Sequence, residues 1–231
     1  NFIALVNAAL ADRKELPFSK TLIDDDEIKL ARAEVNENVI AAMRNSVRSA
    51  YPPYDEQRHR IVLINPNASD LLPQRRWMPD YFVAVMRGLL ADSDEVLVLI
   101  TGAPAEREEA EILKQRVGHE RCVNFAGRQR LEELPALYRI AEMMLTNDSG
   151  PGHFSAVTNL RTFVIFGPET PRLYGSLGNS TPIYAGLACS PCVSATNHRQ
   201  TPCTDNVCLQ VIKPAAVLES LRAALQENRS A

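Results

Sequence analysis

The chain has 231 residues, of which 23% are charged and 45% hydrophobic. This balance is ordinary for a globular protein and excludes a disordered or collagen-like chain. The net charge of −3 gives no general electrostatic basis for binding nucleic acid or an anionic membrane, and no apolar run approaches the roughly 18–20 residues of a membrane-spanning helix. Because the first residue is Asn1 rather than Met and no signal segment follows it, we expect the sequence to be part of a longer protein.

The beginning of the chain differs in pattern from the rest. Four acidic residues at 24–27 place negative charge where a helix N-terminus favours it. Apolar residues then recur at helical spacing. These features predict an amphipathic helix over residues 24–49, ended by Tyr51-Pro52-Pro53-Tyr54.

From Arg60 onward, short apolar runs alternate with helical patterns. The runs predict strands at 61–64, 95–100, 122–125, 143–146 and 162–166. The helical patterns lie at 79–90, 105–117, 131–140 and 214–227. This alternation predicts an α/β fold, a Rossmann-like parallel sheet with helices on both faces. Ligands of such folds bind beyond the carboxyl ends of the strands, so the loops that follow the strands are the candidate sites.

The loop after the fourth predicted strand contains the strongest candidate. Asp148 and Ser149 are residues that begin helices well, and Gly150 lets another group approach the backbone closely. The pattern predicts a helix N-terminus with free amides that favour an anion such as phosphate, to which His153 could also donate. In the alternative reading, the first two residues only cap the helix and the histidine packs.

The loop after the first strand contains Asn67, Ser69 and the pair Arg75-Arg76. Guanidinium groups match phosphate oxygens, so the pair could neutralise a diphosphate. A solvated basic pair beside a buried Trp77 would have the same sequence.

After the second strand, the Glu106 carboxylate could accept hydrogen bonds from ribose hydroxyls, although an acidic start of a helix needs no ligand. Three other motifs are absent: the dinucleotide fingerprint G-x-G-x-x-G after a strand, the phosphate-binding G-x-x-x-x-G-K-[ST], and the hydrolase elbow G-x-S-x-G.

Four of the five cysteines, Cys189, Cys192, Cys203 and Cys208, fall within one short segment. Their spacing could supply four thiolates to one zinc ion, with His198 as a substitute ligand. One or two disulfides, or reduced thiols that pack an irregular loop, are the competing readings.

Residues 148–153 (DSGPGH), followed by a strand that runs into 166–171 (FGPETP), resemble the signature of the bacterial lipopolysaccharide heptosyltransferases, glycosyltransferase family 9. Residues 75–79 (RRWMP) resemble the basic Trp-Pro helix entry of that family, and the cysteine segment resembles the tail of one branch. The resemblance covers about residues 65–210.

The resemblance implies a two-domain GT-B fold made of two facing Rossmann-like halves, of which this chain would be the C-terminal half. Residues 1–58 would be the end of the N-terminal half and a connecting helix. Residues 59–231 would be the nucleotide-sugar-binding domain, with a Cys-rich loop at 186–210.

The resemblance also implies residue roles. Asp148 would hold hydroxyls of the donor sugar, the three residues Ser149, Gly150 and His153 would contact the diphosphate, and Arg75 would take the place of a phosphate-facing lysine. Glu106 would bind the ribose, and the loop at Gln129 would flank the base. The predicted donor-binding residues are Asn67, Ser69, Arg75, Arg76, Glu106, Gln129, Asp148, Ser149, Gly150 and His153.

Two departures from the family pattern matter. Glu169 stands where threonine is usual, and the family's catalytic base, an Asp of the N-terminal half, has no counterpart here. We therefore expect a fragment that binds donor and is inactive alone.

The implied function is inverting transfer of a sugar, a heptose, from a nucleotide diphosphate, ADP, to a lipopolysaccharide core or a related surface saccharide. No cofactor is expected, because the nucleotide sugar is the substrate. The lipid-linked acceptor would bind through the missing half, nucleic acid would not be a partner, and the reaction would occur in the cytoplasm at the inner face of the membrane. The alternatives are a non-catalytic nucleotide-sugar-binding module and a zinc-stabilised interaction module.

Overall fold

The computed structural model describes residues 6–7, 9–11, 28–194 and 197–227. The chain divides into two compact units, Asn1–Ala31 and Arg32–Ala231, and the description below concerns the second. In the part of the chain that is described, no helix has the length and apolar character needed to cross a membrane.

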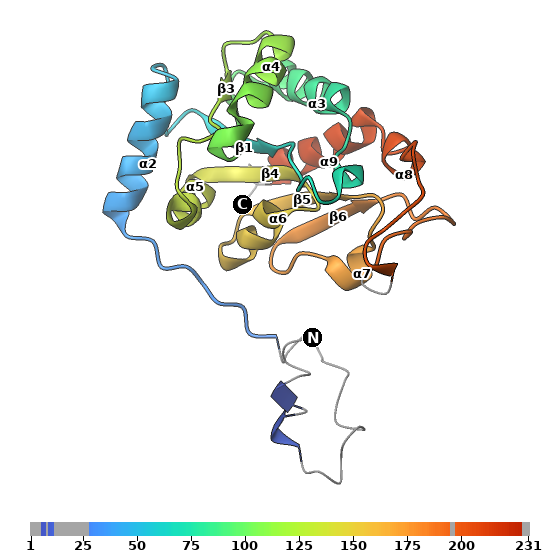
Figure 1. Ribbon diagram of the computed structural model, residues 1–231. Coiled ribbons are helices and arrows are strands. Elements are labelled where there is room, and N and C mark those ends of the chain that lie inside the picture. The colour runs from blue at the N-terminus through green and yellow to red at the C-terminus, as the bar shows by residue number, and fades with distance from the viewer. Residues whose placement is uncertain (1–5, 8, 12–27, 195–196, 228–231) are drawn as a thin grey trace. The chain divides into compact units, whose positions relative to one another are not determined.

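A six-stranded parallel sheet forms the centre of the second unit (Figure 1). Its strands follow the order β3-β2-β1-β4-β5-β6, and every neighbouring pair is parallel. The strands are β1 (Arg60–Asn65), β2 (Val96–Ile100), β3 (Cys122–Asn124), β4 (Ala141–Asn147), β5 (Arg161–Phe166) and β6 (Ser180–Tyr184). The predicted fold class is therefore confirmed.

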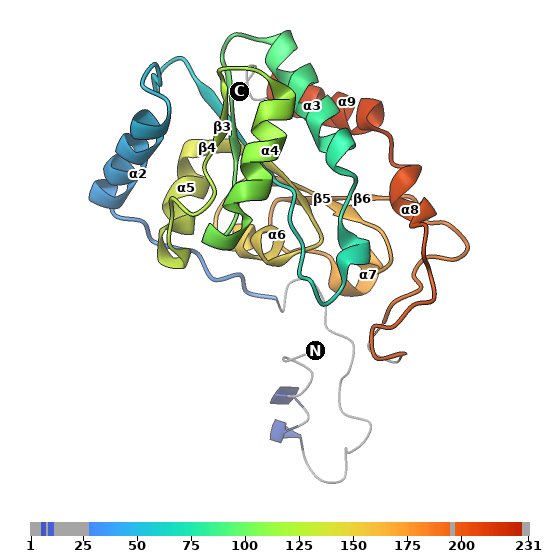
Figure 2. The ribbon, with the colours of Figure 1, turned by 45° about the horizontal axis from the view of Figure 1, so that its top comes forward.

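Helices cover both faces of this sheet because each central strand is apolar on both sides. Within β1, Val62 and Ile64 belong to one core, and Ile61 and Leu63 belong to the other. The first core is closed by α3 (Pro79–Asp92), α4 (Arg107–Val117) and α9 (Pro214–Glu227). The second is closed by α2 (Glu37–Ala50) and α5 (Leu134–Ile140), and Figure 2 shows α2 and α5 on the side away from α3 and α9.

The predicted helix over 24–49 is wrong in its first half. Residues 24–27 lie outside the described residues, 28–36 have no regular secondary structure, and α2 begins only at Glu37. Tertiary hydrogen bonds hold this segment out of a helix: the Arg32 guanidinium donates to the carbonyl oxygen of Thr158, and the amide of Ala33 donates to that of Val157. The side chain of Asn36 then caps α2 by accepting from the amide of Asn38.

The sequence pattern also missed β6, which pairs with β5 with Pro182 opposite Val164. Within the described residues the unit also contains the short α-helices α6 (Gly150–Phe154), α7 (Pro171–Tyr174) and α8 (Val207–Gln210). The unit begins at Arg32 and includes α2, so the compact body is longer than the domain that we expected to start at residue 59. Whether residues 1–58 are the end of a preceding half stays a prediction.

Candidate functional site

The strand order reverses between β1 and β4, and this opens a crevice beyond their carboxyl ends. The side chain of Asn147, the last residue of β4, is fully buried and joins the two loops that leave these strands. Its amide accepts from the backbone N–H of Trp77 at 3.0 Å and donates to the carbonyl oxygen of Pro66 at 2.7 Å. This residue was missed in the sequence, where it is one of many asparagines at strand ends.

A cavity of about 600 Å³ occupies this crevice. Its apolar wall includes Pro104, Leu134, Leu137, Tyr138 and Phe154. The predicted site residues that line it are Asn67, Ser69, Glu106, Gln129, Ser149 and Gly150. A concave, mostly apolar space with a few polar groups on its rim is the usual form of a small-molecule site.

The polar groups of this cavity are only partly used within the protein. Oε1 of Gln129 and Oδ1 of Asn65 are buried and make no hydrogen bond among the described residues. They are therefore open acceptors, since buried polar atoms are normally paired. One carboxylate oxygen of Glu106 is occupied, because it accepts from the amide of Ala103 at 2.5 Å. Gly127 closes the cavity wall with φ of +70°, and a Cβ there would lie 2.9 Å from Cα of Pro104.

The helix predicted after Asp148 is α6, and it is only five residues long. Its dipole is correspondingly small, because the dipole sums over aligned peptide units. No side chain caps its start, and the amides of Ser149 and Gly150 donate no hydrogen bond within the described residues. These two amides, rather than a helix dipole, are what the loop offers to an anion.

A cluster of buried charges surrounds Asp148, which directly precedes the cavity-lining Ser149 but does not itself line the cavity. Asp148 and Glu169 are 2% and 0% exposed. Arg75 lies between them, with Nε 3.6 Å from Oδ2 of Asp148 and Nη2 in contact with Oε2 of Glu169. Burial and the neighbouring Asp148 carboxyl raise the pKa of Glu169, against the lowering effect of Arg75. The result is two carboxyl groups that compete for one buried guanidinium.

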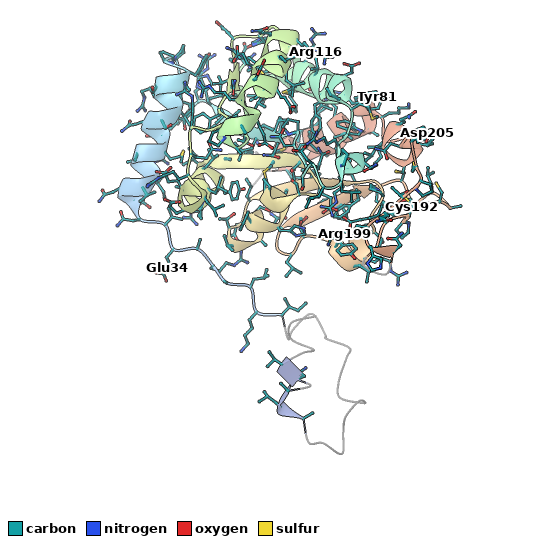
Figure 3. The ribbon with its side chains drawn as sticks, in the orientation of Figure 1. Glu34, Tyr81, Arg116, Cys192, Arg199 and Asp205 are labelled. Carbon is teal, nitrogen blue, oxygen red and sulfur yellow. The ribbon has the colours of Figure 1, made fainter. Side chains whose placement is uncertain are left out.

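Two more side chains reach this cluster from its exposed side. Nε2 of His153 lies 3.7 Å from Oδ1 of Asp148, and its Nδ1 lies 3.3 Å from the hydroxyl of Ser176. Nε of Arg199 lies 3.7 Å from Oε1 of Glu169, and its guanidinium stacks over the ring of Tyr174 in α7. Figure 3 shows Arg199 close to α7. Glu169 was noticed in the sequence only as a departure from threonine, and Arg199 was missed.

Arg76 does not join the other predicted residues. Its guanidinium donates to the carbonyl oxygen of Ala68 at 2.8 Å and pairs with Asp70. It therefore braces its own loop, while the neighbouring Arg75 faces the buried carboxylates.

The cysteine segment, residues 189–208, lies beside the loop that follows β5. The amides of Cys192 and Val193 both donate to the carbonyl oxygen of Pro168 at 3.0 Å. Burial and the nearby thiols raise the pKa of Cys208. All four cysteines are free thiols, and the described residues contain no group of three or more His, Cys, Asp or Glu side chains placed to hold a metal ion. The zinc alternative thus has no support in this arrangement.

Comparison with known proteins identifies a family for this chain. The sequence profile of glycosyltransferase family 9 (heptosyltransferase) matches residues 15–201. Lipooligosaccharide heptosyltransferase 2 of Campylobacter jejuni (serotype O:2) is 29% identical over 176 residues, which cover 73% of this chain and 52% of that protein. The chain thus spans about half the length of the curated relatives that it matches.

Solved structures show the same fold. The structure of E. coli ADP-heptose lps heptosyltransferase II has a TM-score of 0.67 and 20% identity over 86% of this chain and 54% of that one. E. coli heptosyltransferase WaaC with ADP has a TM-score of 0.54 and 18% identity over 77% of this chain and 48% of that one. With a family profile that matches most of its length, this chain belongs to glycosyltransferase family 9, the heptosyltransferases.

Proposed function

We propose that this chain is the donor-binding half of an inverting glycosyltransferase, which transfers a heptose from ADP-heptose to a lipopolysaccharide core at the inner face of the cytoplasmic membrane. The observation that carries the proposal is a cavity of about 600 Å³ at the strand-order reversal, whose lining residue Ser149 directly follows the buried Asp148, a neighbour of Arg75. Two of the similar structures, an ADP-heptose lps heptosyltransferase and a heptosyltransferase with ADP, support the choice of donor.

The cavity accommodates the nucleoside. The adenine lies against the apolar wall of Leu134, Leu137 and Tyr138, where Oε1 of Gln129 is a free acceptor for an amino group. The ribose lies near Glu106, whose second carboxylate oxygen can accept from a hydroxyl. The diphosphate then extends toward the next part of the site.

The transfer step is a displacement at the anomeric carbon. The acceptor oxygen bonds to this carbon while the bond from the carbon to the phosphate oxygen breaks, and the electron pair leaves with ADP. Arg75 and the amides of Ser149 and Gly150 stabilise the negative charge that grows on the leaving group. His153 donates a further hydrogen bond to it. Asp148 accepts hydrogen bonds from sugar hydroxyls. The proton of the acceptor goes to a base on the N-terminal half, so this chain alone binds donor without turnover.

Calorimetric titration with ADP and with ADP-heptose tests the proposal. Arg75→Ala removes a charge-assisted contact, so we expect ADP binding to weaken at least about tenfold. Asp148→Asn should weaken binding of ADP-heptose while leaving ADP unchanged or tighter, because one negative charge near the diphosphate is removed. Arg222→Gln, which removes an exposed ion pair with Asp92 on α3, is the matched control and should bind as wild type does. Absence of binding to ADP and to other nucleoside diphosphates would contradict the proposal.

A further inference from the structure

The buried carboxyl groups of Asp148 and Glu169 are not satisfied by their neighbours. Both oxygens of Glu169 and Oδ2 of Asp148 are buried and make no hydrogen bond among the described residues, although the guanidinium of Arg75 lies beside them. Two ionised carboxylates in such a place are strongly unfavourable, because each loses its hydration without full compensation. A single proton shared by the pair relieves this, since one carboxyl then donates to the other.

Of the two groups, Glu169 is the better holder of that proton. Glu169 is completely buried. Asp148 is 2% exposed and has a second polar neighbour, because Nε2 of His153 lies 3.7 Å from its Oδ1. Burial and the neighbouring Asp148 carboxyl raise the pKa of Glu169, while Arg75 and the half-exposed Arg199 lower it less.

We propose that Glu169 is a positioning residue that carries the proton of the Asp148–Glu169 pair; this inference rests on the donor site proposed above. Asp148 then stays ionised for the sugar, and Arg75 is released to the diphosphate. A neutral Glu169 donates its O–H to Asp148 and holds Arg75 only weakly. An ionised Glu169 holds Arg75 by charge and adds a negative charge where the diphosphate approaches. Glu169 thus acts through its two neighbours and not by touching the donor.

The charged and titratable groups around Glu169 come from four segments. Asp148 directly follows β4, Arg75 lies in the loop after β1, and Arg199 belongs to the cysteine segment. Tyr174 of α7 lies beneath Arg199, and His153 reaches the cluster only through Asp148. Since His153 is itself an ionisable side chain beside Asp148, it has to be removed from the measurement by His153→Gln.

The first experiment measures ADP binding as a function of pH in the His153→Gln background. With Glu169 intact, the dissociation constant should rise by up to about tenfold per pH unit above the pKa of Glu169, because one proton is linked to binding. Glu169→Gln mimics the protonated carboxyl and should bind ADP with little pH dependence. Glu169→Ala removes the titrating carboxyl together with the hydrogen bond to Asp148, so it should bind ADP about tenfold more weakly than Glu169→Gln and with equally little pH dependence. A Gln variant as pH-dependent as the parent protein would overturn the inference.

The second experiment needs no nucleotide and therefore separates this inference from the donor site. The infrared carbonyl band of a protonated carboxylic acid should be present in the wild-type protein well above the ordinary pKa of 4.5 for glutamate and absent from Glu169→Gln. Absence of this band in the wild type would overturn the inference even if ADP binds. Failure of the wild type to bind ADP, with the band present, would contradict the proposed function and leave the protonated pair established.

Discussion

Asn147 joins the two loops of the site, and the cost of losing it can be estimated from its contacts. Its buried side chain pairs with the N–H of Trp77 and the carbonyl oxygen of Pro66. In Asn147→Ala both backbone groups lose their partner inside the protein. A buried group left unpaired costs about 1–3 kcal/mol. We therefore expect the free energy of unfolding to fall by about 3 kcal/mol.

Urea unfolding followed by the fluorescence of Trp77, the only tryptophan, measures this change. Asn45→Ala is the matched control: this asparagine is exposed on α2 and accepts a side-chain hydrogen bond from Arg48, so its loss should cost less than about 0.5 kcal/mol. If Asn147→Ala lies within about 1 kcal/mol of the wild type, the two loops are held by something other than this side chain, and the reasoning fails.

Three further outcomes follow from the structure. Burial raises the pKa of Cys122 to about 12, so at about pH 8 its thiol should react with a disulfide reagent about a thousandfold more slowly than an unburied thiol such as Cys189, as mass-spectrometric mapping would show. Because the pKa of Glu169 is raised above its ordinary 4.5, the stability that its protonated form contributes is lost as pH rises from 4.5 through the pKa of the folded state. Over that pH range the melting temperature of Glu169→Gln should therefore rise relative to that of the wild type. A difference that stays constant with pH would contradict this. At Gly118, with φ of +68°, a Cβ makes only an ordinary contact, 3.7 Å from the carbonyl oxygen of Gln115, so Gly118→Ala should cost about 1 kcal/mol. At Gly127, with φ of +70°, a Cβ also meets backbone 2.9 Å away, so Gly127→Ala should cost about 3 kcal/mol in the same unfolding assay.

The sequence predicted the central strands well because they are buried on both faces. β1 and β2 are nearly continuous apolar runs for this reason, and the two strands pair in regular register along their length. β6 has the sequence Ser-Thr-Pro-Ile-Tyr and lies at the edge of the sheet, where partial exposure removes the apolar signal. The helical spacing of residues 28–36 was misleading, since hydrogen bonds from Arg32 and Ala33 to distant residues outweigh local propensity.

The site could be predicted where it depends on one loop and not where it depends on several. The short stretch from Asp148 to His153 contains its own signal of glycines and capping residues. Glu169 and Arg199 approach that stretch because of how β5 and the cysteine segment pack. A local sequence pattern does not predict such a contact between distant segments. Likewise, Arg75 and Arg76 are equivalent in the sequence, and only the turn at Pro73–Arg75 directs one inward and the other to Asp70.

The position of Pro182 opposite Val164 restricts how copies of this domain can associate. The amide of Thr162 donates to the carbonyl oxygen of Asn179, and backbone directions alternate along a strand. Pro182 therefore turns its ring nitrogen, which has no hydrogen, toward the open side of β6. An additional strand arriving there would lack a ladder bond at its centre. At the opposite edge of the sheet, β3 is only three residues long (Cys122–Asn124), so it has little backbone with which another strand could pair. Growth of the sheet from one molecule into the next is disfavoured at both borders, which protects a long parallel sheet against fibrous aggregation.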